Sequence, residues 1–392
     1  MSLRPEERLV LLLSRGTLRG REEPEARQLL AGRLRWDLIV DIAEREAVYP
    51  LFYCNLGRVG ASSVPMEIHE SLDRRYKANA LRNAVMVREL EDVLALFSGA
   101  GIQAVPLKGV FLAGTLYGNR GLRVCLDMDV LVPIGEVGKA VRLLRGHQYT
   151  SEFPEDDFFE GLLLSQDIEH HLRKPGPISD QWLELHWALL WGPRWDEAAL
   201  EDLWLSAKPR SDLGVAAYGL SREWEFLYLS AHAARHRWRG LKWLADIHEL
   251  SSSTDIDWAQ VKSKAEAVGW SRVVDVSLAV CRSLFGSEVP PPFSVGAPPK
   301  WVACFPNHPS GSTAAPDALA FMRLLEQPWK KLSYLFGVIF IPTLAERRVL
   351  RLPAALGLLY YVIRPFRLAA KWGLHLLRSV SERDRSRQAV AK

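Results

Sequence analysis

A chain of 392 residues is too long for one small core, and two or three domains are expected at about 100 to 200 residues per domain. With 48% hydrophobic and 24% charged residues, the composition is that of a folded protein and excludes a disordered one. The net charge is +4, but the 50 basic and 46 acidic residues are mostly intermixed, so no DNA partner is predicted.

The cysteines and the N-terminus indicate the compartment. The four cysteines are scattered without any Cys-x-x-Cys spacing, which is typical of a reducing compartment and of neither a zinc site nor a disulfide framework. The first residues are charged and lack the apolar stretch and the cleavage site of a secretory signal. Both features favour the cytoplasm.

The first region, residues 1–98, is predicted to be helical. Apolar residues recur at helical spacing over 9–60, where Pro50 marks a break, and again over 66–98. The glycines of 99–101 end this long helix.

Strands are expected only in the second region, residues 99–205. The pattern predicts a strand over 102–107, a helix over 109–117, a second strand over 124–132 and a helix over 136–145. Two further strands, 165–173 and 182–187, flank the turn sequence Lys174-Pro175-Gly176-Pro177 and are expected to pair as an antiparallel hairpin.

The rest of the chain returns to helical spacing. A helical region over 206–288 contains four amphipathic stretches: 221–238, 241–251, 258–268 and 271–285. The final region, 289–392, is predicted to be a proline-rich loop followed by a basic, apolar helical tail. Its apolar run at 353–363 is too short to span a bilayer, which takes about 20 residues, so we expect a buried or interfacial helix.

Two acids dominate the chemistry of the second region. Asp127 and Asp129 stand at i and i+2 of a predicted strand, so both carboxylates face one side while Met128 and Val130 face the interior. Their like charges would repel each other without a cation. Mg²⁺ binds carboxylate oxygens together with substrate phosphates, and the pair therefore predicts a magnesium site.

The turn before these acids suits a phosphate. In Lys108-Gly109 a helix follows a strand directly, which exposes free N–H groups and the positive end of the helix dipole. Lys108 would add a mobile positive charge. Arg123 has two alternative partners, an aspartate or a triphosphate.

A third carboxylate is expected from a neighbouring strand. Glu184 is the best candidate, because strand alternation places it with His186 on one side of the predicted strand. Asp167 and Glu169 are alternatives. His186 itself is either a catalytic residue or a core histidine with satisfied hydrogen bonds.

Histidine pairs elsewhere are weaker metal candidates. His232 and His236 share a helix face, and His170 adjoins His171. No glutamate follows His232 as in the His-Glu-x-x-His pattern, so a packed helix face is the favoured interpretation of that pair.

The combination of these motifs resembles a known family. Leu107-Lys108-Gly109, then Asp127-Met128-Asp129-Val130-Leu131-Val132 and Glu184-Leu185-His186-Trp187 together resemble the uncharacterised nucleotidyltransferase family of the DNA polymerase β-like superfamily. The resemblance covers most of the chain. In place of the superfamily's usual Gly-Ser, the phosphate turn here has Lys108-Gly109-Val110.

The resemblance implies an α+β fold, a small mixed β-sheet nucleotidyltransferase core between helical N-terminal and C-terminal regions. It also implies transfer of a nucleoside monophosphate from an NTP, such as ATP, to a hydroxyl or phosphate. Asp127, Asp129 and Glu184 would then be the catalytic, Mg²⁺-binding residues, and Lys108, Gly109 and Arg123 would hold the nucleotide phosphates.

Two other functions stay open. The chain is alternatively a catalytically inactive nucleotide-binding scaffold or sensor that uses its helical half to bind a partner. The apolar, arginine-flanked tail suggests instead a membrane-surface enzyme acting on lipid-linked or cell-surface sugars, or at least a weak membrane-surface association. The sequence does not select among protein, sugar, small-molecule and RNA acceptors, nor among the four NTPs.

Overall fold

The computed structural model describes residues 3–151, 164, 168–189, 197–210, 214–302, 305–306 and 322–370. The chain forms two compact units, one of residues 1–151 with 169–327 and the other of residues 152–168 with 328–392. Two of the four predicted regions, 1–98 and 206–288, fall within the first unit, and the region 99–205 does so except for residues 152–168. The division of the chain into four regions stays a prediction.

The N-terminal region is helical, as predicted. Pro50 lies in the first turn of α4, where a missing N–H costs nothing, so it helps to begin a helix after α3 rather than interrupting one. The helices of this region are α1 (Pro5–Leu13), α2 (Glu22–Leu30), α3 (Trp36–Arg45), α4 (Tyr49–Gly60), the 3₁₀ turn η1 (Ala61–Ser63) and the long α5 (Met66–Gly99).

A mixed five-stranded sheet follows, in the order β1-β2-β5-β4-β3. β2 runs parallel to β5, and the other three pairings are antiparallel, including the predicted hairpin of β4 and β5. The strands of the sheet and the helices between them are β1 (Val105–Pro106), α6 (Val110–Tyr117), η2 (Arg120–Leu122), β2 (Met128–Leu131), η3 (Ile134–Glu136), α7 (Val137–Gly146), β3 (Thr150–Ser151), β4 (Glu169–Lys174) and β5 (Gln181–His186).

The strands are shorter than the sequence pattern predicts. β2 covers only four residues of the expected 124–132, and β1 covers two of the expected 102–107. Asp127 therefore lies just before β2 instead of inside it. All four residues of β2 are buried, because the strand is covered on both faces of the sheet.

Helices beyond the sheet match the four predicted stretches closely. Capping residues mark the ends of two of these helices. The side chain of Asp257 accepts hydrogen bonds at the start of α12, and Gly269 and Gly286 end α12 and α13 in the left-handed conformation. The elements are α9 (Glu197–Ser206), β6 (Lys208–Arg210), β7 (Ala217–Gly219), α10 (Arg222–Arg235), α11 (Leu241–Ser251), α12 (Trp258–Val268) and α13 (Ser271–Phe285). The short antiparallel pair of β6 and β7 lies beyond residue 205, so the expectation of strands only in the second region was wrong.

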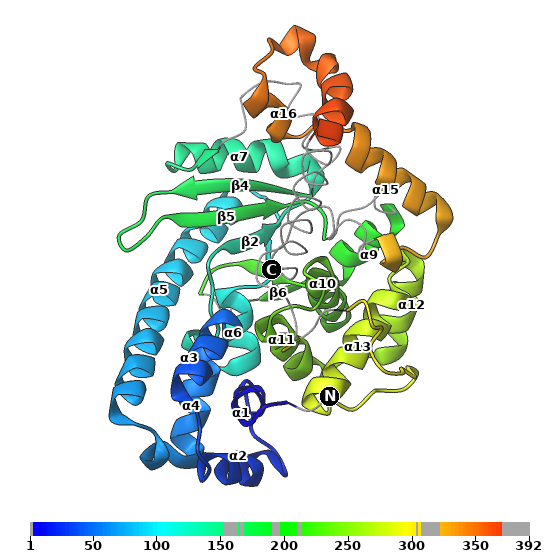
Figure 1. Ribbon diagram of the computed structural model, residues 1–392. Coiled ribbons are helices and arrows are strands. Elements are labelled where there is room, and N and C mark those ends of the chain that lie inside the picture. The colour runs from blue at the N-terminus through cyan, green and yellow to red at the C-terminus, as the bar shows by residue number, and fades with distance from the viewer. Residues whose placement is uncertain are drawn as a thin grey trace, which may run out of the picture. The chain divides into compact units, whose positions relative to one another are not determined.

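One hydrophobic core joins the helices before the sheet to those after it. The core runs from Leu9 in α1 through Phe52 in α4 to Trp238 and Leu244 in the second helical set. Figure 1 shows β2, β5 and β4 side by side, with the blue N-terminal helices and the green-to-yellow helices α10, α11 and α13 gathered below the sheet. The two helical regions therefore share one core and pack together below the sheet (Figure 1).

The second unit contains α15 (Pro328–Phe340), α16 (Leu344–Val349), the 3₁₀ helix η4 (Ala354–Leu359) and a helical stretch over 360–370. The apolar run at 353–363 is not a buried helix: the side chain of Leu358 is 73% exposed. Among the residues that the structure describes, no helix is both long and apolar enough to cross a membrane.

Candidate functional site

The register of β2 against β5 brings two of the predicted acids together. Asp129 is the direct partner of Glu184 across the parallel pair, and the next strand places His171 beside Glu184 and Glu169 beside His186. The side chain of Asp129 is buried and that of Glu184 is partly buried. A cluster of carboxylates thus stands in the middle of the sheet.

Lys108 reaches this cluster from the turn between β1 and α6. Its Nζ lies 2.7 Å from Oδ1 of Asp129, 3.7 Å from Oε2 of Glu184 and 3.9 Å from Oδ1 of Asp127. Burial alone would lower the pKa of Lys108, but the three carboxylates outweigh it and raise the pKa above its ordinary value. The ammonium group therefore stays charged and neutralises part of the cluster.

Gly109 allows the chain to turn directly from Lys108 into α6. Its φ of +70° lies in the left-handed half of conformational space, and a Cβ at this position would stand 3.2 Å from the carbonyl oxygen of Asp127. α6 begins at the next residue, and no side chain caps its N-terminus. The positive end of this helix is therefore adjacent to the segment that carries the acids.

His186 connects the cluster to β4. Its Nε2 lies 3.1 Å from Oδ1 of Asp129 and 3.6 Å from Oε2 of Glu184, and its Nδ1 lies 3.5 Å from Oε2 of Glu169. Burial lowers the pKa of His186, but its hydrogen bonds to these carboxylates outweigh burial and raise the pKa to about 9. His186 is therefore a charged partner of the acids near neutral pH.

Glu169 is the outer acid of this group. Arg235 of α10 pairs with it at 3.0 Å, and His171 lies 3.5 Å away. Burial raises the pKa of Glu169, yet His171, His186 and Arg235 together bring it well below its usual range. Because Arg235 already neutralises Glu169, Glu184 is the third carboxylate that remains available beside Asp129. Asp167 lies outside the described residues.

Within the described part of the chain, two sets of side chains have the spacing of metal ligands. The ligand atoms of Asp129, Glu184 and His186 all lie within 4.8 Å of one another, and so do those of Glu169, His171 and Glu184. Asp127 belongs to neither set, and it joins the cluster through Lys108.

The acids nevertheless fit a hard divalent cation. Oδ2 of Asp129 is buried and has no hydrogen-bond partner within the described part of the chain. A buried carboxylate oxygen without a partner is costly, and a cation removes that cost. Oxygen ligands from two aspartates and a glutamate are the kind that Mg²⁺ prefers.

Tyr228 of α10 was not anticipated as a site residue. Burial raises the pKa of its phenol, and the charges of Asp129 and Glu184 raise it further. Its hydroxyl is buried and has no hydrogen-bond partner among the described residues. The only sequence signal was its position one turn before His232, on the same helix face.

Arg123 pairs with an aspartate, and its contact with a nucleotide stays a prediction of the resemblance. Its guanidinium is buried and pairs at 2.9 Å with Asp246 of α11, which also accepts a hydrogen bond from the hydroxyl of Tyr117. This pairing is one of the two alternatives that the sequence left open. It ties the segment before β2 to α11.

The histidines of α10 pack against other rings. His236 stacks on Trp243 with ring centroids 4.3 Å apart, and His232 meets the same indole edge-on at 5.5 Å. These contacts confirm the packed helix face that the sequence favoured for this pair.

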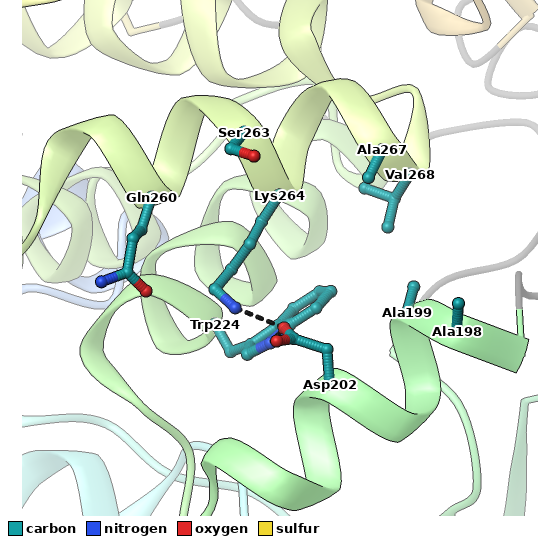
Figure 2. A pocket seen from close by; sticks show the side chains of 9 residues that line it. All are labelled: Ala198, Ala199, Asp202, Trp224, Gln260, Ser263, Lys264, Ala267 and Val268. Carbon is teal, nitrogen blue, oxygen red and sulfur yellow. Dashed lines mark hydrogen bonds and ion pairs between the residues drawn. The ribbon is translucent and has the colours of Figure 1, made fainter.

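A separate hollow of about 310 Å³ lies among α9, α10 and α12. Figure 2 shows Lys264 of α12 extending toward Asp202 of α9, beside the ring of Trp224. The indole N–H of Trp224 also donates to Asp202 at 2.8 Å. The charged groups of this hollow thus have partners, and none of the predicted site residues lines it.

Comparison with known families supports the resemblance. A family model described as "Uncharacterised nucleotidyltransferase" matches residues 33–286, which is more than half of the chain. The match contains all the residues of the carboxylate cluster and Lys108. It also contains α6, which follows Lys108, and α10, which carries Arg235. No curated protein matches the chain.

Proposed function

Since the chain belongs to the family of uncharacterised nucleotidyltransferases, we propose that its carboxylate cluster transfers a nucleoside monophosphate from an NTP to a hydroxyl or phosphate acceptor. The observation that carries this proposal is the convergence of Asp127, Asp129 and Glu184 around Lys108, next to the start of α6. Acids that bind a cation and a helix N-terminus that attracts phosphate are the two parts that such a reaction needs.

In this proposal Asp127, Asp129 and Glu184 hold Mg²⁺. A magnesium ion bound there would supply Lewis-acid stabilisation of the charge that develops on the phosphates. The unpartnered Oδ2 of Asp129 supports the assignment, because it offers a buried lone pair for a ligand.

Lys108 and Gly109 hold the phosphates. Lys108 lies two residues before the start of α6, so a rotation of its side chain would move its ammonium from the acids toward an anion at the helix N-terminus. Gly109 keeps that turn free of a side chain, so phosphate oxygens can approach the backbone N–H groups.

Glu184 also orients the acceptor or takes its proton. It is less buried than Asp129, with 18% of its side chain exposed, and therefore has access to an incoming hydroxyl. The pKa of Glu184 is lowered, since His186 and Lys108 outweigh burial, so the group is a carboxylate near neutral pH. His186 positions Asp129 and Glu184, and Arg123 positions the segment that leads to Asp127.

The test begins with calorimetry of ATP, GTP, CTP and UTP in the presence of Mg²⁺, on the native chain and on Asp127→Asn with Asp129→Asn. We expect one or more NTPs to bind, with a magnesium-dependent part that the double substitution abolishes. Asp37→Asn is the matched control, since Asp37 is an exposed acid of α3.

Transfer is then measured with an α-labelled NTP and protein, RNA, sugar or small-molecule fractions as acceptors. Label that appears in an acceptor with the native chain, and disappears with the double substitution, supports the proposal. Tight NTP binding without label transfer to any acceptor would favour the inactive scaffold or sensor instead.

A further inference from the structure

The segment of residues 328–370, called the C-terminal segment below, has a buried group of ion pairs and hydrogen bonds. Glu346 of α16 is fully buried and pairs at 3.2 Å with Arg364, which is itself 9% exposed. Arg367 pairs with the same carboxylate, and Nε of Arg364 donates to the carbonyl oxygen of Val338 at 3.0 Å. Charged groups thus hold α15, α16 and the helical stretch 360–370 together.

Tyr360 adds to this polar interior. It is fully buried, and its hydroxyl accepts a hydrogen bond from the backbone N–H of Leu352 and donates one to the carbonyl oxygen of Leu350, both at 2.8 Å. Its ring packs against a few partly buried apolar side chains, among them Ile341 and Ile363. The apolar core of the segment is therefore small.

Four large apolar side chains of α15 are exposed to solvent. None of the residues of this helix is buried. Trp329, Leu332, Phe336 and Phe340 are each exposed, and Leu332 has 68% of its surface free. Steps of three, four and four residues put these four side chains on one stripe of the helix, and the rings of Phe336 and Phe340 are 4.9 Å apart.

The remainder of the segment continues this pattern. Among the exposed large hydrophobic residues that the structure describes, eleven of eighteen lie in the C-terminal segment. Single exposed apolar residues are ordinary, but such a concentration marks an interaction surface. Beyond α15 these residues are Val349, Leu350, Leu356, Leu358, Leu359, Val362 and Phe366.

The charge of the segment selects the kind of partner. Residues 328–370 contain seven Lys and Arg and a single acid, Glu346, which is buried against arginines. Exposed apolar side chains on a segment of net positive charge complement anionic lipid headgroups above an acyl layer. Pairing with a second copy would bring the same basic excess against itself, which charge repulsion opposes.

We propose that the C-terminal segment binds the surface of an anionic phospholipid bilayer, with the stripe of Trp329, Leu332, Phe336 and Phe340 entering the boundary between headgroups and acyl chains. The 13 residues of α15 extend about 20 Å, against about 30 Å for the hydrocarbon core, so the helix lies along the surface and does not span it. Lys330 and Lys331 meet the lipid phosphates. This inference is independent of nucleotidyl transfer.

The experiment is flotation of the full chain with vesicles of phosphatidylcholine, with and without phosphatidylglycerol. We expect the native chain to float with the anionic vesicles and not with the neutral ones. Leu332→Glu with Phe336→Glu should abolish flotation, because both side chains are exposed and their loss leaves the polar interior intact. Leu81→Glu, at an exposed leucine of α5, is the matched control and should still float.

A second arm tests the charge. Lys330→Ala with Lys331→Ala should weaken binding to anionic vesicles on the order of tenfold, and added salt should act in the same direction. Absence of flotation with anionic vesicles, or flotation that survives both glutamates, would overturn the proposal. A dimer in light scattering that the two glutamates dissociate would assign the stripe to a second copy and overturn it as well.

Discussion

Nζ of Lys108 lies 2.7 Å from Oδ1 of Asp129, with Glu184 and Asp127 within 3.9 Å of the same ammonium. A divalent cation held by all three carboxylates would compete with this ammonium for the same negative charge, and two cations close together repel each other. Metal binding at the three acids therefore requires Lys108 to move toward the N-terminus of α6.

Replacing Lys108 by methionine tests this competition. We expect Lys108→Met to bind Mn²⁺ in the absence of nucleotide about tenfold more tightly than the native chain, a difference of about 1.4 kcal/mol. Without metal the variant should melt at lower temperature, because three acids lose a buried partner, and Mn²⁺ should restore the loss. Lys242→Met is the control, since the ammonium of Lys242 contacts the carbonyl oxygen of Val124. Equal Mn²⁺ affinities for the native chain and Lys108→Met would refute the competition.

The stability of the fold should depend on His186 at alkaline pH. Its pKa is raised from 6.5 to about 9 in the folded chain, so its contribution is fully present below pH 6.5 and is lost as pH rises through about 9. The loss is on the order of 3 kcal/mol of unfolding free energy. Urea titrations at pH 6.5 and pH 9.5 measure it. In His186→Gln the difference between the two pH values should shrink by that amount, and an unchanged difference would contradict the assignment.

Gly109→Ala separates backbone strain from steric conflict. Both Gly109 and Gly118, at the two ends of α6, have a positive φ, but only at Gly109 would a Cβ approach another backbone atom, the carbonyl oxygen of Asp127 at 3.2 Å. Gly118→Ala should therefore cost about 1 kcal/mol, and Gly109→Ala should cost more. Only Gly109→Ala should weaken NTP binding. Thermal melting and calorimetry give both quantities, and equal behaviour of the two variants would argue against a phosphate turn at Gly109.

The pair of Arg123 and Asp246 should act as one structural unit. Breaking a buried ion pair by removing one partner costs about 3 to 5 kcal/mol, so Arg123→Met and Asp246→Leu should each destabilise the chain by that order. The double substitution should cost less than the sum, as a double-mutant cycle in urea would measure. If Arg123→Met instead kept its stability and lost NTP affinity, Arg123 would be the phosphate ligand that the family resemblance implied.

Tyr228→Phe removes a hydroxyl that has no hydrogen-bond partner among the described residues. We expect the unfolding free energy of the ligand-free chain to stay the same or to rise by about 1 kcal/mol, since a buried unpaired polar group is lost. Affinity for an NTP with Mg²⁺ should fall if the hydroxyl faces the bound substrate. Calorimetry next to a melting curve separates the two effects, and an unchanged NTP affinity would show that the hydroxyl takes no part in binding.

Much of the fold and of the site was readable along the chain. The helices at 66–98, 241–251, 258–268 and 271–285 were predicted nearly to the residue. In each of them apolar residues recur at helical spacing over the whole length, and the helix ends at glycine or a capping side chain. Local spacing in extended segments also singled out Asp127, Asp129 and Glu184, which all lie within 3.9 Å of the ammonium of Lys108, and their catalytic roles stay predictions.

Only the tertiary structure decided which partner each charged group meets. That Lys108 lies among the acids and that Arg123 meets Asp246 both depend on contacts between residues that are 21 and 123 positions apart in the chain, which no local pattern encodes. The same holds for the C-terminal segment. The sequence showed an apolar, basic tail, and the fold turned two of its arginines, Arg364 and Arg367, inward and many of its aromatic and aliphatic side chains outward, because Glu346 is a buried partner for both arginines.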